Sequence, residues 1–137
     1  MDNQTLKKIK DILLTQISDD YTDIGYIGIL ESEIPGLGDD KELEKQYMLK
    51  AIEELLAENK IRVGNLNNES GSFLRYWDMN NAEIIKKLDK EWVHYFGPHH
   101  WEYHQIPMFD ISEGYARQIG KYQSDQEKFE KEKPNDG

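Results

Sequence analysis

The fold is decided by residues 53–64, which read EELLAENKIRVG. The first part of this stretch continues an apolar stripe with helical spacing, whereas Ile61 and Val63 alternate with polar or small residues at the period of two that a strand requires. Asn59, between the two patterns, is suited to the left-handed conformation that ends many helices. The stretch therefore predicts a helix that runs almost directly into a β-strand.

Upstream, the sequence predicts three helices. The longest covers residues 41–58, opened by a capping box of Asp39 and Glu42. Residues 24–30 are apolar but interrupted by glycine, which favours a short buried helix over a strand. The apolar residues of the first and third helices recur at helical spacing, which predicts that they face the core. In the first helix, which Asp2 or Asn3 can cap, these residues are Leu6, Ile9, Leu13 and Ile17. In the third helix they are Leu43, Met48, Ile52, Leu55 and Leu56.

Downstream, the sequence predicts a β-hairpin, a helix, an extended segment and a last helix. Strands at 61–66 and 73–78 flank a turn at 67–72. Asn80 and Glu83 form a capping box for a helix over 81–95. Residues 101–110 read as extended, with Pro107 confining them to a sheet edge or a bulge. Ser112 is the expected cap of the last helix. The inward residues of that helix are predicted to be Tyr115, Ala116, Ile119 and Tyr122.

Length and composition indicate one small acidic domain. The chain has 137 residues, which suits a single domain over 1–122 followed by a charged tail over 123–137 with little to bury. It has no cysteine, which excludes disulfides and thiolate chemistry. Because no signal-peptide pattern or membrane-length apolar run occurs, we expect a cytoplasmic protein without membrane contact.

The order of helix, short helix, long helix and hairpin resembles a winged helix-turn-helix. Residues 53–64 resemble the end of a recognition helix that enters the first wing strand, and residues 109–114, FDISEG, resemble the strand-to-helix step that closes the wing in MarR-like and PadR-like regulators. That step is one residue shorter than their Leu-Thr-x-x-Gly pattern, and the helix at 81–95 is an insertion. Over residues 24–119 the chain is similar to small bacterial winged-helix-like proteins of unassigned function. The resemblance implies a winged-helix-like α+β fold.

Charge argues against the DNA binding that a winged helix invites. The formal net charge is −10, and residues 39–62 carry five cations against seven anions. Nucleic-acid binders usually neutralise phosphates with clustered Lys and Arg, whereas the wing loop 65–72 carries Glu69 and no cation. A DNA-binding transcriptional regulator is therefore the alternative and not the first hypothesis.

The histidines suggest a second alternative, a metal-dependent enzyme. All four lie within the cluster His94–His104, and in an extended segment His100, Glu102 and His104 would face one way, as a zinc or nickel site requires. No His-Glu-x-x-His element supports this reading. Serines lie at turns or caps, and Gly36-Leu37-Gly38 lacks the lysine of a phosphate loop. We therefore expect no catalytic residue, no cofactor and no metal.

The remaining hypothesis is a non-enzymatic, acidic protein-interaction module. An acidic surface complements a basic protein, and an immunity or antitoxin role against a basic toxin suits the size and charge. Most aromatic residues should build the core, but exposed tyrosine and tryptophan dominate binding hot spots. The predicted partner-binding residues are Tyr76, Trp77, Trp101, Glu102 and Tyr103.

Overall fold

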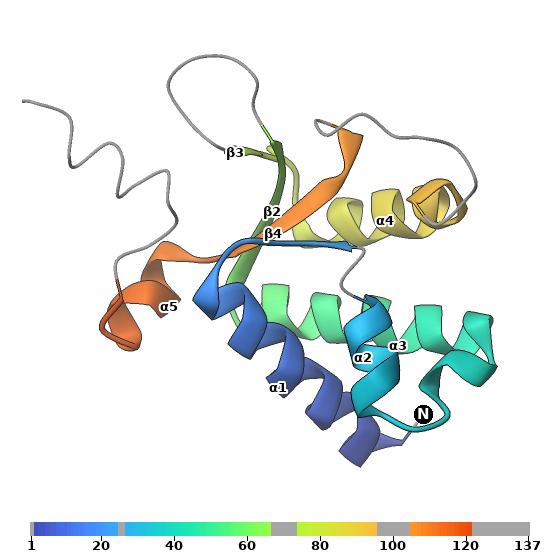
Figure 1. Cartoon of the computed structure of the whole chain (residues 1–137). Helices are drawn as coiled ribbons and strands as arrows, with labels where there is room; N and C mark the ends of the chain where they lie inside the picture. Colours follow the sequence, from blue (N-terminus) through green and yellow to red (C-terminus); the bar gives the residue numbers. More distant parts are fainter. Residues whose placement is uncertain (1, 25–26, 67–73, 96–104, 122–137) are drawn as a thin grey trace, which may run out of the picture.

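The computed structural model describes residues 2–24, 27–66, 74–95 and 105–121. These residues form five α-helices, one 3₁₀ helix and a four-stranded antiparallel sheet (Figure 1). In chain order the elements are α1 Asn3–Asp19, β1 Thr22–Asp23, α2 Ile27–Glu33, η2 Leu37–Asp39, α3 Lys41–Ala57, β2 Ile61–Leu66, β3 Leu74–Tyr76, α4 Asn81–Tyr95, β4 Pro107–Ile111 and α5 Glu113–Gln118. The expected α+β class is confirmed.

The sheet has the strand order β1-β4-β2-β3. The predicted hairpin is present as β2 and β3, with Leu66 opposite Leu74. After α4 the chain returns to the opposite edge of β2, where β4 pairs over its whole length and sets Val63 opposite Phe109. The short strand β1 then pairs with β4 on its other side. The chain therefore leaves the hairpin, forms α4, and comes back to fill the middle of the sheet.

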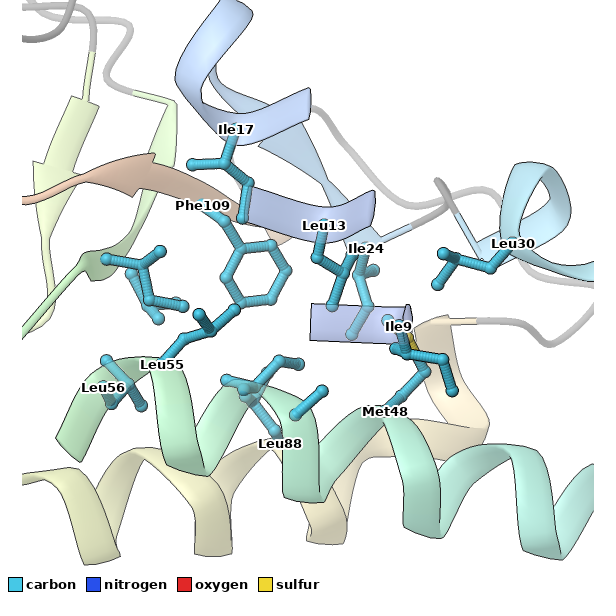
Figure 2. Packing of buried hydrophobic residues seen from close by; sticks show 14 of the residues in the cluster. Ile9, Leu13, Ile17, Ile24, Leu30, Met48, Leu55, Leu56, Leu88 and Phe109 are labelled. Carbon is cyan, nitrogen blue, oxygen red and sulfur yellow. The ribbon is translucent and has the colours of Figure 1, made fainter. Parts of the chain in front are cut away.

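A single apolar core lies between the sheet and the helices. Along β2 and β4 alternate residues face this core, because successive side chains of a strand point to opposite faces. Phe109 of β4 lies between Ile17 of α1 and Leu55 of α3, while Leu88 of α4 approaches α3 from its other side (Figure 2). Helix α3 is therefore central to the core, with α1 and α4 packed against it (Figure 1).

Most helix ends follow the capping chemistry of the sequence. The side chains of Asp2, Asn80 and Ser112 accept hydrogen bonds from backbone amides of the first turns of α1, α4 and α5. Asn59 adopts a φ of 55° just after α3, in the left-handed region expected for it. These ends are predictable because capping depends on a few adjacent residues.

The cap of α3 differs from the prediction by one residue. Asp40, not Asp39, accepts hydrogen bonds from the amides of Glu42 and Leu43, each at 3.1 Å. We expect Asp40→Ala to lower the free energy of unfolding by about 1 kcal/mol, because two amides lose their acceptor. Asp39→Ala is the matched control, with an expected change within about 0.5 kcal/mol. Urea denaturation of both variants measures the difference, and equal losses would contradict the assignment of the cap.

Three further predictions are corrected by the structure. Leu43 is 42% exposed and Ile119 is 38% exposed, although both were expected to face the core. β4 is an interior strand, not an edge or a bulge. It tolerates Pro107 because this residue is the first of the strand, before the pairing with β1 begins. The polar stretch 18–23 predicts a turn-rich link, whereas Thr22–Asp23 within it forms the strand β1.

Other expectations lie outside the described residues. Tyr122 and the tail over 123–137 belong to this group. None of the helices in the part of the chain described here has the length and apolar character needed to cross a membrane.

Candidate functional site

In the part of the chain that the structure describes, a concentration of negative charge lies where α2, η2 and the start of α3 meet. Between residues 31 and 44 the only cation is Lys41, and the carboxylates are Glu31, Glu33, Asp39, Asp40, Glu42 and Glu44. We call these six carboxylates, with Leu43 among them, the acidic end. In Figure 1 it occupies the cyan segment and the adjoining end of α3.

Local folding explains why the acidic end presents so much charge. Pro35 and Gly36 follow α2, and Gly36 has a φ of 84°, which favours glycine and reverses the chain into η2. Asp40 then begins α3, so that Glu42 and Glu44 lie in the first turn, where anions are favoured by the helix dipole. Most of these carboxylates are exposed, but Glu44 is only 4% exposed.

Leu43 gives the acidic end an apolar element. The buried stripe of α3 runs through Glu44, Met48, Ala51 and Leu55, and Leu43 lies one residue off that stripe. Leu43 and Ile119 are the exposed large hydrophobic residues of the described part of the chain. A single exposed leucine is ordinary on a protein surface. Its position among carboxylates nevertheless makes the surface amphipathic.

Glu31, Lys41 and Glu44 form a linked group inside the acidic end. Lys41 Nζ lies 2.7 Å from Glu31 Oε1 and 3.7 Å from Glu44 Oε1. Burial, followed by the adjacent Glu31, raises the pKa of Glu44 to about 7. The hydrogen bond with Glu44, followed by that with Lys41, lowers the pKa of Glu31. The two shifts have opposite directions, so that a proton is held by Glu44 in preference to Glu31.

The positive charges of α3 are neutralised within the chain. Lys41 pairs with Glu31, Lys45 Nζ lies 2.8 Å from Asp89 Oδ1 of α4, and Lys50 Nζ lies 3.1 Å from Glu53 Oε1. No lysine of α3 therefore lacks an anionic neighbour, and this helix is described along its whole length. The result is a helix without a cationic ridge.

Helix α3 is also covered on two sides. Lys10 of α1 donates a hydrogen bond of 3.1 Å to Glu54, and the ion pair of Lys45 with Asp89 joins α3 to α4. Between these contacts the helix buries residues from Glu44 to Leu56. A recognition helix must expose a face to a DNA groove. The exposed face of α3 runs through Glu42, Gln46, Lys50 and Glu53 and carries more negative than positive charge.

Two of the predicted partner-binding residues are described, and both are half-buried in intramolecular contacts. The hydroxyl of Tyr76 donates a hydrogen bond of 2.8 Å to Asp110 Oδ2. The indole nitrogen of Trp77 donates one of 2.6 Å to Asn65 Oδ1, and the ring packs against the core. These contacts give both side chains a structural role in joining strands.

Tyr76 belongs to a polar cluster on the sheet face away from the core. Arg62 and Asp110 are cross-strand neighbours, with 3.5 Å between Arg62 Nη2 and Asp110 Oδ2. The Arg62 guanidinium lies 4.0 Å from the centroid of the Tyr76 ring. Tyr76 thus reaches across β2 to Asp110 on β4, and the cluster ties three strands together.

The remaining predicted site residues lie outside the described residues. They are His99, His100, Trp101, Glu102, Tyr103 and His104, together with the side chain of His94. Within the described residues, no group of three or more acidic or histidine side chains is arranged to hold a metal ion. The metal-site alternative therefore stays a prediction.

The fold and the acidic end describe a small α+β protein with an amphipathic, carboxylate-rich surface. Comparisons with protein-family models, curated proteins and solved structures found no match to this chain. The acidic end was not among the residues predicted for partner binding. Its signal was nevertheless present in the sequence, as a run of six carboxylates and one lysine over residues 31–44.

Proposed function

We propose that this chain is a non-enzymatic binding module that engages a basic protein partner through its acidic end. The observation that carries the proposal is the concentration of exposed carboxylates around Leu43 at the start of α3. Charge complementarity of this kind steers association and suppresses wrong partners. A basic toxin neutralised by an immunity-type or antitoxin-type protein is one partner with the required chemistry.

Leu43 supports a protein partner over a small cation. Interfaces generally combine a desolvated apolar centre with a polar rim. In the acidic end the exposed Leu43 is the apolar residue, and Asp39 and Glu42 lie close to it in sequence. An arginine-rich or lysine-rich surface with one apolar pocket would complement this arrangement.

Gene regulation is the second candidate, because the element order favours a winged helix. α1, β1, α2 and α3 precede β2, and β4 lies between β1 and β2, as the closing strand of a wing would. Two features weigh against binding of α3 in the major groove of DNA. Its lysines are paired with carboxylates of the same chain, and α1 and α4 cover two of its sides. A winged-helix-like scaffold adapted for protein binding is consistent with both observations.

Charge reversal at the acidic end tests the proposal. The immobilised chain is exposed to native lysate at about 50 and 500 mM salt, a range over which exposed charge pairs become strongly screened. We expect a basic protein to be retained at low salt and released at high salt. The double variant Asp39→Lys with Glu42→Lys should reduce retention of that protein at least about tenfold, which corresponds to about 1.4 kcal/mol.

A matched control distinguishes the effect of the acidic end on partner binding from the effect of the overall net charge. Asp11→Lys with Glu83→Lys makes the same change in charge at exposed positions of α1 and α4, and Glu83, like Glu42, lies in a first helical turn. Equal losses in both double variants would contradict a specific acidic end. Selective enrichment of one DNA sequence, unaffected by the Asp39 and Glu42 changes, would favour the regulator.

A further inference from the structure

Glu44 is a carboxylate in a position where α3 otherwise buries apolar side chains. It lies on the stripe that continues through Met48, Ala51 and Leu55, and it is 4% exposed. Its Oε2 atom is buried and accepts no hydrogen bond from the described residues. A buried carboxylate oxygen without a donor is costly when charged, whereas a protonated carboxyl group can itself donate.

Glu31 is placed to accept that proton. Its side chain extends from α2 and lies against η2, where a Cβ atom added to Gly38 would come within 2.9 Å of Glu31 Cδ. Glu31 thereby lies between the η2 backbone and the start of α3, with Lys41 Nζ 2.7 Å from its Oε1 atom. Lys41 Nζ also lies 3.7 Å from Glu44 Oε1, so that Glu31 and Glu44 flank the same ammonium group where α2, η2 and α3 meet.

We propose that Glu31 and Glu44 form a proton-dependent clasp that holds α2 and η2 against the start of α3 and loosens when the shared proton is lost. With the proton present, Glu44 donates to Glu31, and Lys41 balances the single remaining negative charge. Without it, two adjacent carboxylates face one lysine, and the buried one has no donor. The clasp therefore weakens as the pH rises.

The other charged and titratable groups around the clasp do not replace the proton. On α3, Tyr47 accepts a hydrogen bond from the Asp2 amide at 2.8 Å, and Lys45 is paired with Asp89 of α4. Asp39 of η2 lies close to Gly36 and adds a further negative charge. Asp2, ahead of α1, accepts hydrogen bonds from Gln4 and Thr5. Lys41 is consequently the cation that serves the pair.

The direction of the pH dependence follows from the pKa of Glu44. Burial and the adjacent Glu31 raise this pKa from 4.5 to about 7, so the folded chain holds the proton more tightly than the unfolded chain. The stability contributed by Glu44 is complete below its ordinary pKa and is lost as the pH rises through about 7. The lowered pKa of Glu31 acts in the opposite direction, at more acidic pH.

The clasp connects proton uptake to the acidic end. Loss of the proton adds one negative charge beside Leu43 and loosens the segment that carries Asp39. The effect on a basic partner rests on the proposed function, whereas the clasp itself is tested on the isolated chain. Failure of one is therefore distinguishable from failure of the other.

Two measurements on the full chain test the clasp. Carboxyl ¹³C NMR should show Glu44 titrating near pH 7, with amide shifts in α2 and η2 that follow the same midpoint. The melting temperature of the wild-type chain should fall by roughly 5 °C more than that of Glu44→Gln between pH 5 and 8. Glu42→Gln, an exposed neighbour in the same turn, should keep the wild-type dependence.

The comparison between variants is needed because the chain contains 4 histidines, which titrate in the same range. Their contribution is common to all three proteins and cancels in the difference. If Glu44→Gln does not fold, the carboxyl titration of the wild-type chain decides the question alone. A Glu44 midpoint near 4.5, or the same melting profile in Glu44→Gln and wild type, would overturn the clasp.

Discussion

Phe109→Ala is expected to lower the free energy of unfolding by about 3–5 kcal/mol. Phe109 is 3% exposed and lies opposite Val63 in the middle of the sheet. Its ring fills the space between Ile17 of α1 and Leu55 of α3 (Figure 2). Alanine would leave a cavity where the sheet and two helices meet, and such a loss is a large fraction of the ~5–15 kcal/mol that stabilises a typical domain.

Urea denaturation, followed by far-ultraviolet circular dichroism, measures the Phe109 effect. Phe109→Leu should give a clearly smaller loss, because most of the apolar volume is kept. The melting temperature of the alanine variant should fall by roughly 10 °C or more. A loss below about 1 kcal/mol would show that β4 does not pack against α1 and α3 as described.

The helices and their ends were largely predictable because the information is local. Apolar spacing located the buried residues of α1, and the caps Asn80 and Ser112 act within three residues of their amides. The hairpin of β2 and β3 was predictable for the same reason. By contrast, the pairing of β4 with β2 and β1 joins residues far apart in the sequence. Alternation along a strand does not reveal its neighbours, so Pro107 was wrongly confined to an edge.

The start of α3 shows how composition misleads when a charged residue is buried. Hydrophobicity favoured Leu43 for the core, yet the continuous stripe passes through Glu44. The adjacent Glu31 and Lys41 make the buried position of Glu44 possible. Sequence spacing does not reveal this contact, because Glu31 lies on a different helix. The approach of Glu31 to Glu44 depends on the chain reversal at Gly36, where the sequence predicts only the end of a helix. The charge run over 31–44 was visible, but its coincidence with an exposed leucine was not.

The predicted aromatic surface stays a prediction, but topology adds information about two of its residues that composition does not contain. Tyr76 and Trp77 were nominated for partner binding because such residues are common in hot spots. In the folded chain Tyr76 joins β3 to β4 through Asp110, and Trp77 bonds to Asn65 of β2. Both contacts cross strand boundaries. Their intramolecular roles make them weaker candidates than Leu43, which makes no comparable packing contribution.

Gly64 gives the second large expected effect, because the backbone of its paired strand β3 approaches it closely. A Cβ atom at this position would come within 2.9 Å of both the Arg75 carbonyl carbon and Tyr76 Cα, and closer still to the Arg75 carbonyl oxygen. Backbone atoms cannot move aside as a flexible side chain can. We therefore expect Gly64→Ala to lower the free energy of unfolding by about 2–3 kcal/mol, chiefly by separating β3 from β2.

Gly114→Ala is the matched control for Gly64→Ala. The nearest atom to a Cβ at Gly114 is Asn59 Nδ2 at 3.9 Å, and the residue lies in α5. Alanine there should leave stability unchanged or raise it by about 0.5–1 kcal/mol, since glycine is a poor helix former. Hydrogen exchange should show loss of protection at the β3 amides only in Gly64→Ala. Retained protection there would contradict the close approach of the two strands. If β3 does separate, Tyr76 must also leave Asp110, because the hydrogen bond between them spans β2, with Tyr76 opposite Gly64 and Asp110 opposite Arg62.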